Sequence, residues 1–543
     1  MENVRSAVVG IDLGTTYSCV SSIDELGNPV VGKNKTGSAT TPSVVHFPIG
    51  RESSECEVGQ VAKDSAVVEP ERTAQLFKPL MGKRGVSALV LDGEKISPQE
   101  ASAYVLKKIT DDYVERYGTD IAGVVITVPA HFGQQEREAT VEAGEMAGLN
   151  VLGIVQEPVA AAVFYGVCET GEDGDFLVYD LGGGTFDVTA VSVRHTDDSD
   201  VVEVICVEGN HELGGRLWDD RVIEYLADEY CEQKGIEGEL SAYSMQALRT
   251  AAEDAKQRLS ETDETPVSLM LEQGPARIML SRELFDELTS DLLANTIDLT
   301  RRALENAEQK GHTIDRVLLV GGSTWMPQVK DALERNFPNL RLERTDPDEA
   351  VAKGAAICAM KRMVDSVDSA SGPDVVGVVG NDAVGAISGR GLELGVVTSK
   401  SYGVKATYSD GIERISNLIL KNRKIDKLTG VYEKTKSYKT LEGYPTQASV
   451  GIEVYENDEE VASCALNDGR MVVSQSFDLE EFRLPADSPI TVTFSLNEEG
   501  LLRIRAVEPT NGKEIRFEKK VLGLTPEEKA KAKARVTGIA AQD

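Results

Sequence analysis

Two stretches of the sequence place an aspartate in front of a glycine-rich turn. One stretch, "AVVGIDLGTTYSCVSSI", begins at Ala7, and the other, "FLVYDLGGGTFDVTAVSV", begins at Phe176. Each runs from an apolar segment through Asp-Leu-Gly to a threonine and a second apolar segment, which is typical of two strands joined by a turn. The recurrence predicts that one hairpin has been duplicated within the chain.

The residues of these turns suit a polyphosphate. Consecutive glycines weaken a regular strand or helix, but they let phosphate oxygens reach successive backbone N–H groups, which form an anion-binding nest. Asp12 and Asp180 end the first strand of each hairpin, where a carboxylate can hold a hydrated Mg²⁺ ion. A plain tight turn would also accommodate Gly182, Gly183 and Gly184, so the glycines alone are weak evidence. The presence of two matching hairpins in one chain is what favours a phosphate site. A third glycine motif, "VLLVGGSTWMP", suits the adenosine end of a nucleotide.

The elements around these motifs change character along the chain. Residues 1–365 alternate short β-branched runs with helical patterns, which predicts an α/β region with a buried sheet. Residues 366–391 are rich in Gly, Ser, Asp and Val, so they are expected to form a linker, although the valines could instead form a short strand. Beyond about Leu392, short alternating segments separated by turns predict an antiparallel β domain. A helix is expected to follow, with Thr525 as its N-cap and Pro526 in its first position.

Composition excludes several classes of protein. The 543 residues include 41% apolar and 27% charged residues, which is typical of globular domains. A net charge of −33 opposes binding to nucleic acid or to an anionic membrane. The seven cysteines form no CxxC pair, which argues against a disulfide framework or a zinc ribbon. Because no signal peptide or spanning segment is evident, we expect a cytoplasmic protein.

Six motifs together resemble one known family. "GIDLGTTYSCV", "ITVPAHFGQQEREAT", "IVQEPVAAAVFYG", "DLGGGTFDVT", "VGGSTWMPQV" and "DPDEAVAKGAA" occur in the order and at the spacing of DnaK-type seventy-kilodalton heat-shock chaperones, within the actin-like ATPase superfamily. The resemblance implies an actin-like, duplicated, two-lobed ATPase domain at 1–365, an interdomain linker at 366–395, a β-sandwich peptide-binding domain at 396–523 and a short helix at 524–543. The helical lid that normally follows the sandwich is expected to be absent, because the sequence is that of a divergent lidless or truncated member.

The resemblance also implies the chemistry and the residues of the ATP site. Water would attack the γ-phosphate in line, with Mg²⁺ as the cofactor ion, K⁺ as a further candidate, and ADP as the product. The implied catalytic residues are Asp12, Lys78, Glu157, Asp180, Thr185 and Asp187. Asp12, Asp180 and Asp187 would organise Mg²⁺ and the attacking water. Asp12 and Asp180 would hold the ion through water. The implied nucleotide-binding residues are Gly14, Thr15, Thr16, Tyr17, Gly182, Gly183, Gly184, Thr185, Gly214, Gly215, Glu253, Lys256, Ser260, Gly321, Gly322, Ser323, Trp325 and Asp348.

Several positions leave alternatives open. Lys78 lies in "KPLMG", which departs from the family's more basic pattern, and an isolated lysine is more often a solvated surface charge. Glu157 could simply stabilise the helix that starts near Pro158. Gln257 stands where many members have Arg, and Trp325 replaces the Arg usual after "GGST". An indole can stack on a purine, but Trp325 could instead pack on a lobe surface.

The C-terminal part resembles the family's substrate domain more faintly. In the family this domain binds an extended apolar peptide through main-chain hydrogen bonds and one side-chain pocket. Val404, Leu441 and Val450 are the candidates for that pocket, with ordinary core positions as the alternative. The connector normally has an acidic residue followed by leucines, and the nearest matches are "DVVGVV" at Asp374 and "LELGVV" at Leu392.

These observations favour an ATP-dependent chaperone in which nucleotide state sets the affinity for extended apolar segments. A J-domain co-chaperone and a nucleotide-exchange factor are partners expected from the family. The alternative is a weakly hydrolysing relative that binds ATP and acts as a regulatory or scaffolding partner. A filament-forming actin relative or a sugar kinase would share the hairpins, but it would not explain the β domain after Leu392.

Overall fold

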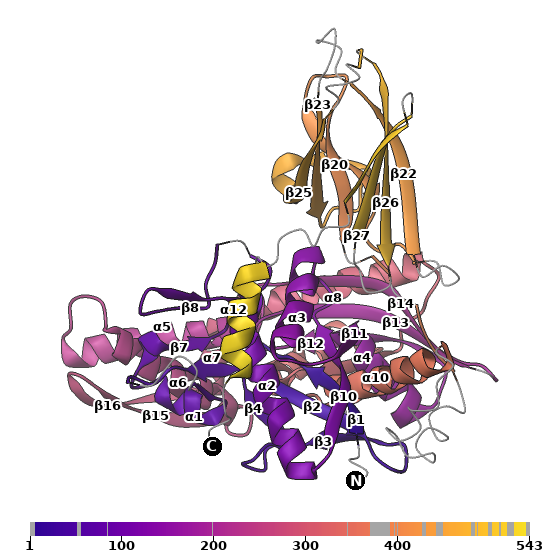
Figure 1. Ribbon diagram of the computed structural model, residues 1–543. Helices are drawn as coiled ribbons and strands as arrows, with labels where there is room; N and C mark the ends of the chain where they lie inside the picture. The colour runs from indigo at the N-terminus through magenta and orange to yellow at the C-terminus, as the bar shows by residue number, and fades with distance from the viewer. Residues whose placement is uncertain are drawn as a thin grey trace.

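The computed structural model describes residues 6–50, 56–83, 85–197, 199–344, 346–369, 391–395, 397–398, 400–425, 431–440, 449–478, 484–485, 487–497, 502–509, 512–517 and 526–538. Two lobes of mixed α/β structure lie side by side, and a separate pair of sheets lies next to them (Figure 1). We call the lobe that contains β1 lobe I, the lobe that contains β12 lobe II, and the pair of sheets formed by β20–β28 the sandwich.

Lobe I is built on a mixed sheet in which β1 pairs parallel to β10 and antiparallel to β2. The strand order is β11-β10-β1-β2-β3, and β4 also pairs with β2. The strands are β1 (Ser6–Asp12), β2 (Tyr17–Ile23), β3 (Pro29–Gly32), β4 (Thr40–Pro42), β10 (Asp120–Val128) and β11 (Val151–Gln156).

Lobe II repeats this arrangement. Strand β12 pairs parallel to β17 and antiparallel to β13, in the order β18-β17-β12-β13-β14-β19. The strands are β12 (Gly174–Leu181), β13 (Phe186–His195), β14 (Ser199–Asn210), β17 (Arg316–Val320), β18 (Arg341–Glu343) and β19 (Gly391–Gly395). The hairpin β1–β2 therefore corresponds to β12–β13, and the predicted duplication is confirmed.

Two helices connect the lobes through a shared apolar core. Helices α4 (Glu157–Val163) and α10 (Ala350–Ser369) contribute alanines and valines to a cluster that also contains strand residues of both sheets, Val8 and Val178 among them. A Cβ on Gly354 would lie 1.8 Å from the carbonyl oxygen of Ala160. The absence of a side chain there lets α10 cross α4 at close range.

Other helices cover the outer faces of the lobes. In lobe I, α2 (Pro98–Tyr117) and α3 (Gln134–Met146) pack on one core, and in lobe II, α5 (Gly215–Lys234), α6 (Ala242–Leu259), α8 (Ser290–Gln309) and α9 (Pro327–Asn336) pack on another. The smaller elements are α1 (Gln60–Ser65), α7 (Arg282–Leu288), β5 (Val44–His46), β6 (Glu57–Val58), β7 (Thr73–Gln75), β8 (Leu89–Leu91), β9 (Glu94–Ile96), β15 (Glu264–Leu271) and β16 (Gly274–Ser281). Short helical turns include η1 (Pro70–Arg72), η2 (Lys78–Leu80), η3 (Phe164–Thr170), η4 (Gly322–Trp325) and η5 (Leu466–Asp468).

The sandwich consists of two antiparallel sheets around its own core. Alternate residues of its strands point inward, as the period of two in the sequence predicts, and Phe494 and Ile452 lie among the buried side chains. One sheet contains β24 (Ser463–Ala465), β21 (Glu413–Ile419), β20 (Ser401–Thr407), β23 (Ser449–Asn457) and β25 (Gly469–Asp478), and the other contains β22 (Val431–Lys439), β26 (Pro489–Asn497), β27 (Leu502–Glu508) and β28 (Lys513–Phe517).

The segment between lobe II and the sandwich differs from a free linker. Part of the expected linker, Gly391–Gly395, forms β19 and pairs in parallel with β14 of lobe II. Helix α10 also runs on to Ser369, past the expected domain end at residue 365. Of the two connector candidates, "LELG" is thus a strand of the lobe II sheet, whereas the one at Asp374 lies outside the described residues. The exact domain boundaries stay a prediction.

The last described helix, α12 (Pro526–Thr537), packs on lobe I. Its Val536 and Ala532 are buried in the lobe I core, and its Arg535 guanidinium binds both carboxylate oxygens of Glu100 at 2.6 and 2.7 Å. Figure 1 shows it beside α2 and α3. None of the helices in the part of the chain that the structure describes is long and apolar enough to cross a membrane.

Candidate functional site

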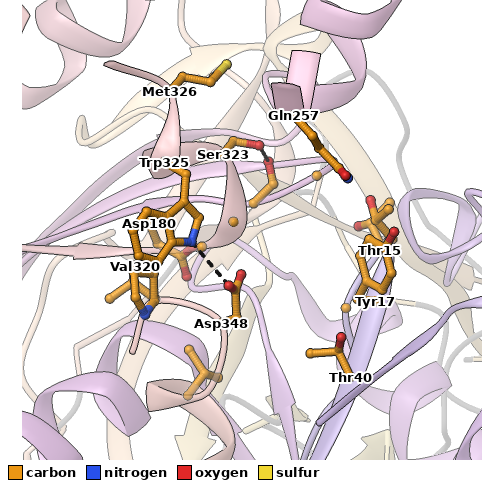
Figure 2. A pocket seen from close by; sticks show the side chains of 18 of the residues that line it. Thr15, Tyr17, Thr40, Asp180, Gln257, Val320, Ser323, Trp325, Met326 and Asp348 are labelled. Atoms are coloured by element: carbon orange, nitrogen blue, oxygen red, sulfur yellow. Dashed lines mark hydrogen bonds between the residues drawn. The ribbon is translucent and has the colours of Figure 1, made fainter. Parts of the chain in front are cut away.

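A pocket of about 900 Å³ lies between the lobes and takes its walls from both hairpins (Figure 2). Most of the predicted site residues line it: Asp12, Gly14, Thr15, Thr16, Tyr17, Lys78, Glu157, Asp180, Gly182, Gly183, Thr185, Glu253, Lys256, Ser260, Gly321, Gly322, Ser323, Trp325 and Asp348. The remaining predicted residues, Gly184, Asp187, Gly214 and Gly215, are not part of its lining.

The two hairpin turns touch each other at the pocket. A Cβ on Gly183 would lie 2.0 Å from Thr16 Oγ1, and one on Gly184 would lie 2.8 Å from Thr15 Oγ1. Only glycines allow this approach without moving the threonines. The two turns are thereby brought together at the pocket. The N–H groups of Gly14 and Gly182 donate within their own turns, to Ser18 Oγ and to the carbonyl oxygen of Thr185.

The first turn of α5 supports the second hairpin from behind. The N–H groups of Gly215 and Arg216 donate to the carbonyl oxygens of Gly182 and Gly183 at 2.9 and 2.8 Å. A Cβ on Gly214 would lie 2.4 Å from the backbone carbon of Gly184. Gly214 and Gly215 therefore fix the position of the turn without lining the pocket.

Lys78 and Glu157 form a buried ion pair in the pocket wall. Lys78 Nζ lies 2.6 Å from Glu157 Oε1, and both side chains are buried. Burial raises the pKa of Glu157 to about 7, against the opposing charge of Lys78. The alternative that Lys78 is a solvated surface lysine is therefore wrong. Glu157 is the first residue of α4, so it lies at a helix N-terminus and also contacts Lys78. The two interpretations of Glu157 from the sequence are therefore compatible.

Asp12 and Asp180 give the pocket an excess of negative charge. Burial raises the pKa of both carboxyls, and Lys78 is the cation that opposes this shift at each of them. For Asp180, the neighbouring carboxylates of Glu157 and Asp187 raise the pKa further. In the part of the chain that the structure describes, no three His, Cys, Asp or Glu side chains lie close enough together to hold a metal ion directly. A divalent cation at these carboxylates would therefore keep water or phosphate oxygens among its ligands.

Asp187 is held by a residue that the sequence did not indicate. His131 Nδ1 lies 3.0 Å from Asp187 Oδ1, and the N–H of Ala130 donates to Oδ2 at 3.3 Å. Asp187 is buried next to Glu157 and Asp180, which both respond to its charge. His131 lies within the motif "ITVPAHFGQQEREAT", but it was not selected as a site residue, because its contact with Asp187 depends on how β10 and β13 are placed.

Glu253 makes a contact across the cleft. Its carboxylate binds Lys63 Nζ at 2.8 Å and accepts a hydrogen bond from Tyr17 OH at 3.2 Å. Lys63 and Tyr17 belong to lobe I, whereas Glu253 lies on α6 of lobe II. Glu253 thus connects the two lobes, and it also lines the pocket. Its role in binding the nucleoside stays a prediction. Lys63 was not predicted from the sequence.

The neighbouring residues of α6 line the pocket as expected. Lys256 Nζ lies 2.7 Å from Asp219 Oδ1 and donates to the carbonyl oxygen of Gly215 at 3.1 Å. Gln257, on the same helix, and Ser260, directly after its last residue, also line the pocket. Asp219, on α5, was missed because nothing in its local sequence distinguishes it from the other acidic residues of that helix.

Trp325 lies in the pocket wall, in the turn η4. Its indole is 46% exposed, so the residue is not core material. Its Nε1–H donates to Asp348 Oδ2 at 3.2 Å, as Figure 2 shows, and the Arg344 guanidinium lies 4.6 Å from the ring centroid. Further lining residues that the sequence analysis did not select are Cys19, Thr40, Asp219, Glu261, Val320, Met326, Pro327, Lys330, Arg344, Pro347 and Val351.

The candidates for a peptide pocket lie in or next to the sandwich core. Val404 is buried in that core, and Val450 is partly buried against it. Leu441 lies outside the described residues. The positions of Val404 and Val450 agree with the alternative of ordinary core residues, and their role in binding a peptide stays a prediction.

Comparison with known proteins agrees with this architecture. A family model described as "Hsp70 protein" matches residues 8–90 and 85–543. The chain is 34% identical over 527 residues to the chaperone protein DnaK of Thermosipho melanesiensis, covering 95% of this chain and 80% of the relative. It is 35% identical over 528 residues to the DnaK proteins of Thermotoga petrophila and Thermotoga maritima, with the same coverage. The duplicated lobes, the sandwich and these matches show that the chain belongs to the Hsp70 family of chaperones.

Proposed function

We propose that this chain is an ATP-driven chaperone that hydrolyses ATP in the pocket between its lobes. The observation that carries the proposal is the convergence of both hairpin turns and the Lys78–Glu157 pair on one pocket. A phosphate nest and a buried ion pair in the same cavity provide the groups that phosphoryl transfer needs, since that reaction depends on positioning and charge stabilisation.

The proposed roles follow from position. The turn N–H groups and the hydroxyls of Thr15, Thr16 and Thr185 would bind the phosphates. Lys78 would stabilise the charge on the transferring γ-phosphoryl group. Glu157, with a pKa of about 7, would orient the attacking water and take up its proton as the bond to phosphorus forms.

The carboxylates would hold the cofactor ion. Asp12 and Asp180 would bind Mg²⁺ through water. Asp187, which lies next to Glu157 and Asp180 but does not line the pocket, would help to organise the ion and the attacking water. When bound, Mg²⁺ would neutralise part of the polyphosphate charge. K⁺ is a further candidate ion for the same acidic cluster. The charge excess at Asp12 and Asp180 supports this assignment.

The sandwich would bind the client. An extended apolar segment can add to a sheet edge through main-chain hydrogen bonds and place one side chain in a pocket. We assign that pocket to the region of Val404, Leu441 and Val450. A J-domain co-chaperone and a nucleotide-exchange factor are the partners that this cycle would use.

Single-turnover ATP hydrolysis by the full chain tests the proposal. We expect a slow basal rate that an extended apolar peptide accelerates, and no hydrolysis in Thr185→Ala, which lacks a hydroxyl at the turn. Thr196→Ala, in which a threonine is removed far from the pocket, is the matched control and should behave as the wild type. Absence of hydrolysis in the wild type, with ATP still bound, would contradict the proposal.

A second function is favoured by two residues in the pocket. Gln257 and Trp325 stand where many relatives have arginines, so nucleotide binding could be retained for a scaffolding role while hydrolysis is weak. In that case ATP would raise the melting temperature, peptide would leave the rate unchanged, and the Thr185→Ala variant would still bind the same protein partners as the wild type.

A further inference from the structure

A smaller cavity of about 60 Å³ lies between the lobes, next to the first hairpin turn. Its volume is enough for several water molecules, and so for one small anion. Four residues line both this cavity and the larger pocket: Thr15, Thr16, Asp219 and Glu253. Figure 2 shows Thr15 across the larger pocket from Trp325. The shared residues form a common wall between the pocket and the smaller cavity, which we call the side cavity.

The side cavity is held in shape by its own lining. Ser43 lines it, and the Ser43 N–H donates to the carbonyl oxygen of Thr16 at 2.8 Å, while Ser43 Oγ donates to that of Gly14 at 2.8 Å. Leu76, another lining residue, has a φ of 56°, which residues with a side chain rarely adopt. A strained backbone persists only where its surroundings hold it. The side cavity is therefore a built feature of the fold.

One cation of the side cavity is left without an acid. Each carboxylate that lines the cavity is paired with a cation: Glu253 with Lys63, Asp219 with Lys256 and Asp220 with Arg216. Arg249 also lines the cavity, but among the residues that the structure describes it has no carboxylate within ion-pair distance. Its Nη1 donates to the neutral Gln246 Oε1 at 3.4 Å. The side cavity thus offers an anion a positive charge that no acid neutralises.

The larger pocket has the opposite balance of charge. Asp12, Glu157 and Asp180 line it around a single lysine, Lys78. Inorganic phosphate is an anion at neutral pH, so these carboxylates repel it once its bond to ADP has broken. The nearby guanidinium of Arg249 attracts it. Both effects act in the same direction, across the wall formed by Thr15 and Thr16.

We propose that the side cavity is a binding site for inorganic phosphate, through which the phosphate produced by hydrolysis leaves the pocket. This inference rests on the proposed function, because ATP hydrolysis supplies the product. Arg249 binds the anion, since a guanidinium matches phosphate oxygens in shape and charge. Gln246 is a positioning residue that holds the guanidinium. Phosphate from solution has the same chemistry, so it enters the side cavity by the reverse route.

A hydrogen bond between the lobes spans the side cavity. Gln75 Nε2 of lobe I donates to Gln246 Oε1 of lobe II at 2.9 Å, and both residues line the cavity. Gln246 is buried and accepts from Arg249 as well. A phosphate that passes through the side cavity has to pass this bond. Removal of the Gln75 amide therefore widens the route while Arg249 keeps its contact with Gln246.

Exchange of inorganic phosphate with the ADP-loaded full chain tests the site. Phosphorus NMR exchange spectroscopy measures the rates at which added phosphate enters and leaves the protein. Arg249→Ala should lower both rates about tenfold, as is usual when one charge-assisted hydrogen bond is lost. Arg249→Lys should recover most of the loss, because it restores the charge, and Gln75→Ala should raise both rates. Arg258→Ala is the matched control, because Arg258 lies on the same helix and lines neither cavity.

Single-turnover hydrolysis follows the product instead of added phosphate. Acid quenching measures the hydrolysis step, and a fluorescent phosphate sensor measures release into solution. We expect release by Arg249→Ala to lag behind hydrolysis by more than it does in the wild type. A purely structural role of Arg249 would slow both steps together and produce no additional lag.

The outcomes that would overturn the inference are distinguishable. Unchanged phosphate exchange in Arg249→Ala, or an equal loss in Arg258→Ala, would exclude the side cavity as a phosphate site. Slower exchange of added phosphate without a lag in product release would show that the site takes phosphate from solution only. A wild type that does not hydrolyse ATP, but whose phosphate exchange still depends on Arg249, would remove the proposed function and leave the phosphate site.

Discussion

Lys78 is the residue on which the charge balance of the pocket depends. It opposes the raised pKa values of Asp12, Glu157 and Asp180. We expect Lys78→Ala to lower single-turnover hydrolysis about a hundredfold or more, since a charge-stabilising group of this kind typically contributes that much. Lys83→Ala, which changes an exposed lysine of the same segment, should hydrolyse ATP at the wild-type rate. A Lys78→Ala variant with unchanged hydrolysis would remove Lys78 from the mechanism.

His211 makes the folded state sensitive to acid. Burial is the largest cause that lowers its pKa, followed by the charge of His131, whose ring centroid lies 5.5 Å away. The unfolded chain binds a proton at His211 near pH 6.5, whereas the folded chain binds it only at a lower pH. Protonation therefore favours the unfolded chain, and the free energy of unfolding decreases as the pH falls below about 6.5. We expect His211→Gln to reduce the loss of unfolding free energy between pH 7.5 and pH 5.5, measured by urea denaturation. An identical loss in both proteins would contradict this role.

Sequence patterns identified most of the pocket residues that the glycine-rich turn motifs carry. Asp12, Thr15, Gly182 and Ser323 line the pocket. Each of them belongs to a hairpin or turn motif that is visible in the sequence. The contacts made by Lys63, His131, Asp219 and Arg344 could not be predicted in this way, because each joins residues far apart in the sequence. The partners of Lys63 and His131 are set by how the two lobes are placed, and those of Asp219 and Arg344 by how distant segments of lobe II pack. No local pattern records either.

The start of α5 is the element that holds the second hairpin in place. A Cβ on Gly214 would meet backbone atoms of Gly184 and Thr185 at 2.4 to 2.6 Å, whereas one on Gly182 would find its nearest neighbour at 3.7 Å. We expect Gly214→Ala to lower the unfolding free energy of the ligand-free protein by about 1–3 kcal/mol, as overpacking usually does. Gly182→Ala, measured in the same thermal denaturation, should remain close to the wild type in stability. Equal stability of both variants would show that the turn and α5 can separate freely.

The sequence predicts helices and strands that have their own apolar period. It does not predict elements that form only because they pair or pack with a distant part of the chain. The strands of both hairpins and the alternation in β26 are visible in the sequence because each has its own apolar period. Strand β19 was expected as part of a linker, since the alternation of Leu392, Glu393 and Leu394 is too short to predict a strand by itself. Pairing with the edge of β14 makes this segment a strand. The helix at 524–543 was expected, but its packing on α2 and α3 depends on an apolar surface of lobe I that the sequence does not reveal.

At the scale of the whole molecule, polar contacts connect the sandwich to the lobes. Arg470 of β25 binds Glu136 of α3 at 2.6 Å and Glu456 of β23 at 2.8 Å. The backbone N–H of Leu502 donates to Gln134 Oε1 at 2.7 Å. Interfaces between domains of one chain that rest on polar contacts are commonly reversible. The position of the sandwich should therefore respond to single charged residues in the interface.

Arg470 lies between the buried carboxylate of Glu456 and the partly buried carboxylate of Glu136 at this interface. Burial raises the pKa of Glu456, and Glu136 raises it further, while Arg470 opposes both effects. Removing the guanidinium would leave the two acids facing each other, so Arg470→Ala should favour separation of the sandwich from lobe I. The expected cost is about 1 kcal/mol of docking free energy, because Arg470 is partly exposed and solvent screens its charge.

Small-angle X-ray scattering measures this separation directly. We expect a larger radius of gyration for Arg470→Ala than for the wild type, together with faster protease cleavage in the segment between lobe II and the sandwich. Arg505→Ala is the matched control, since Arg505 pairs with Glu514 on the outside of the sandwich and makes its ion pair within that domain. It should leave the radius of gyration unchanged. If Arg470→Ala and Arg505→Ala scatter alike, the sandwich is held by its remaining contacts, such as those of Leu502 and Asn422 with lobe residues, and the charge cluster at Arg470 does not control docking.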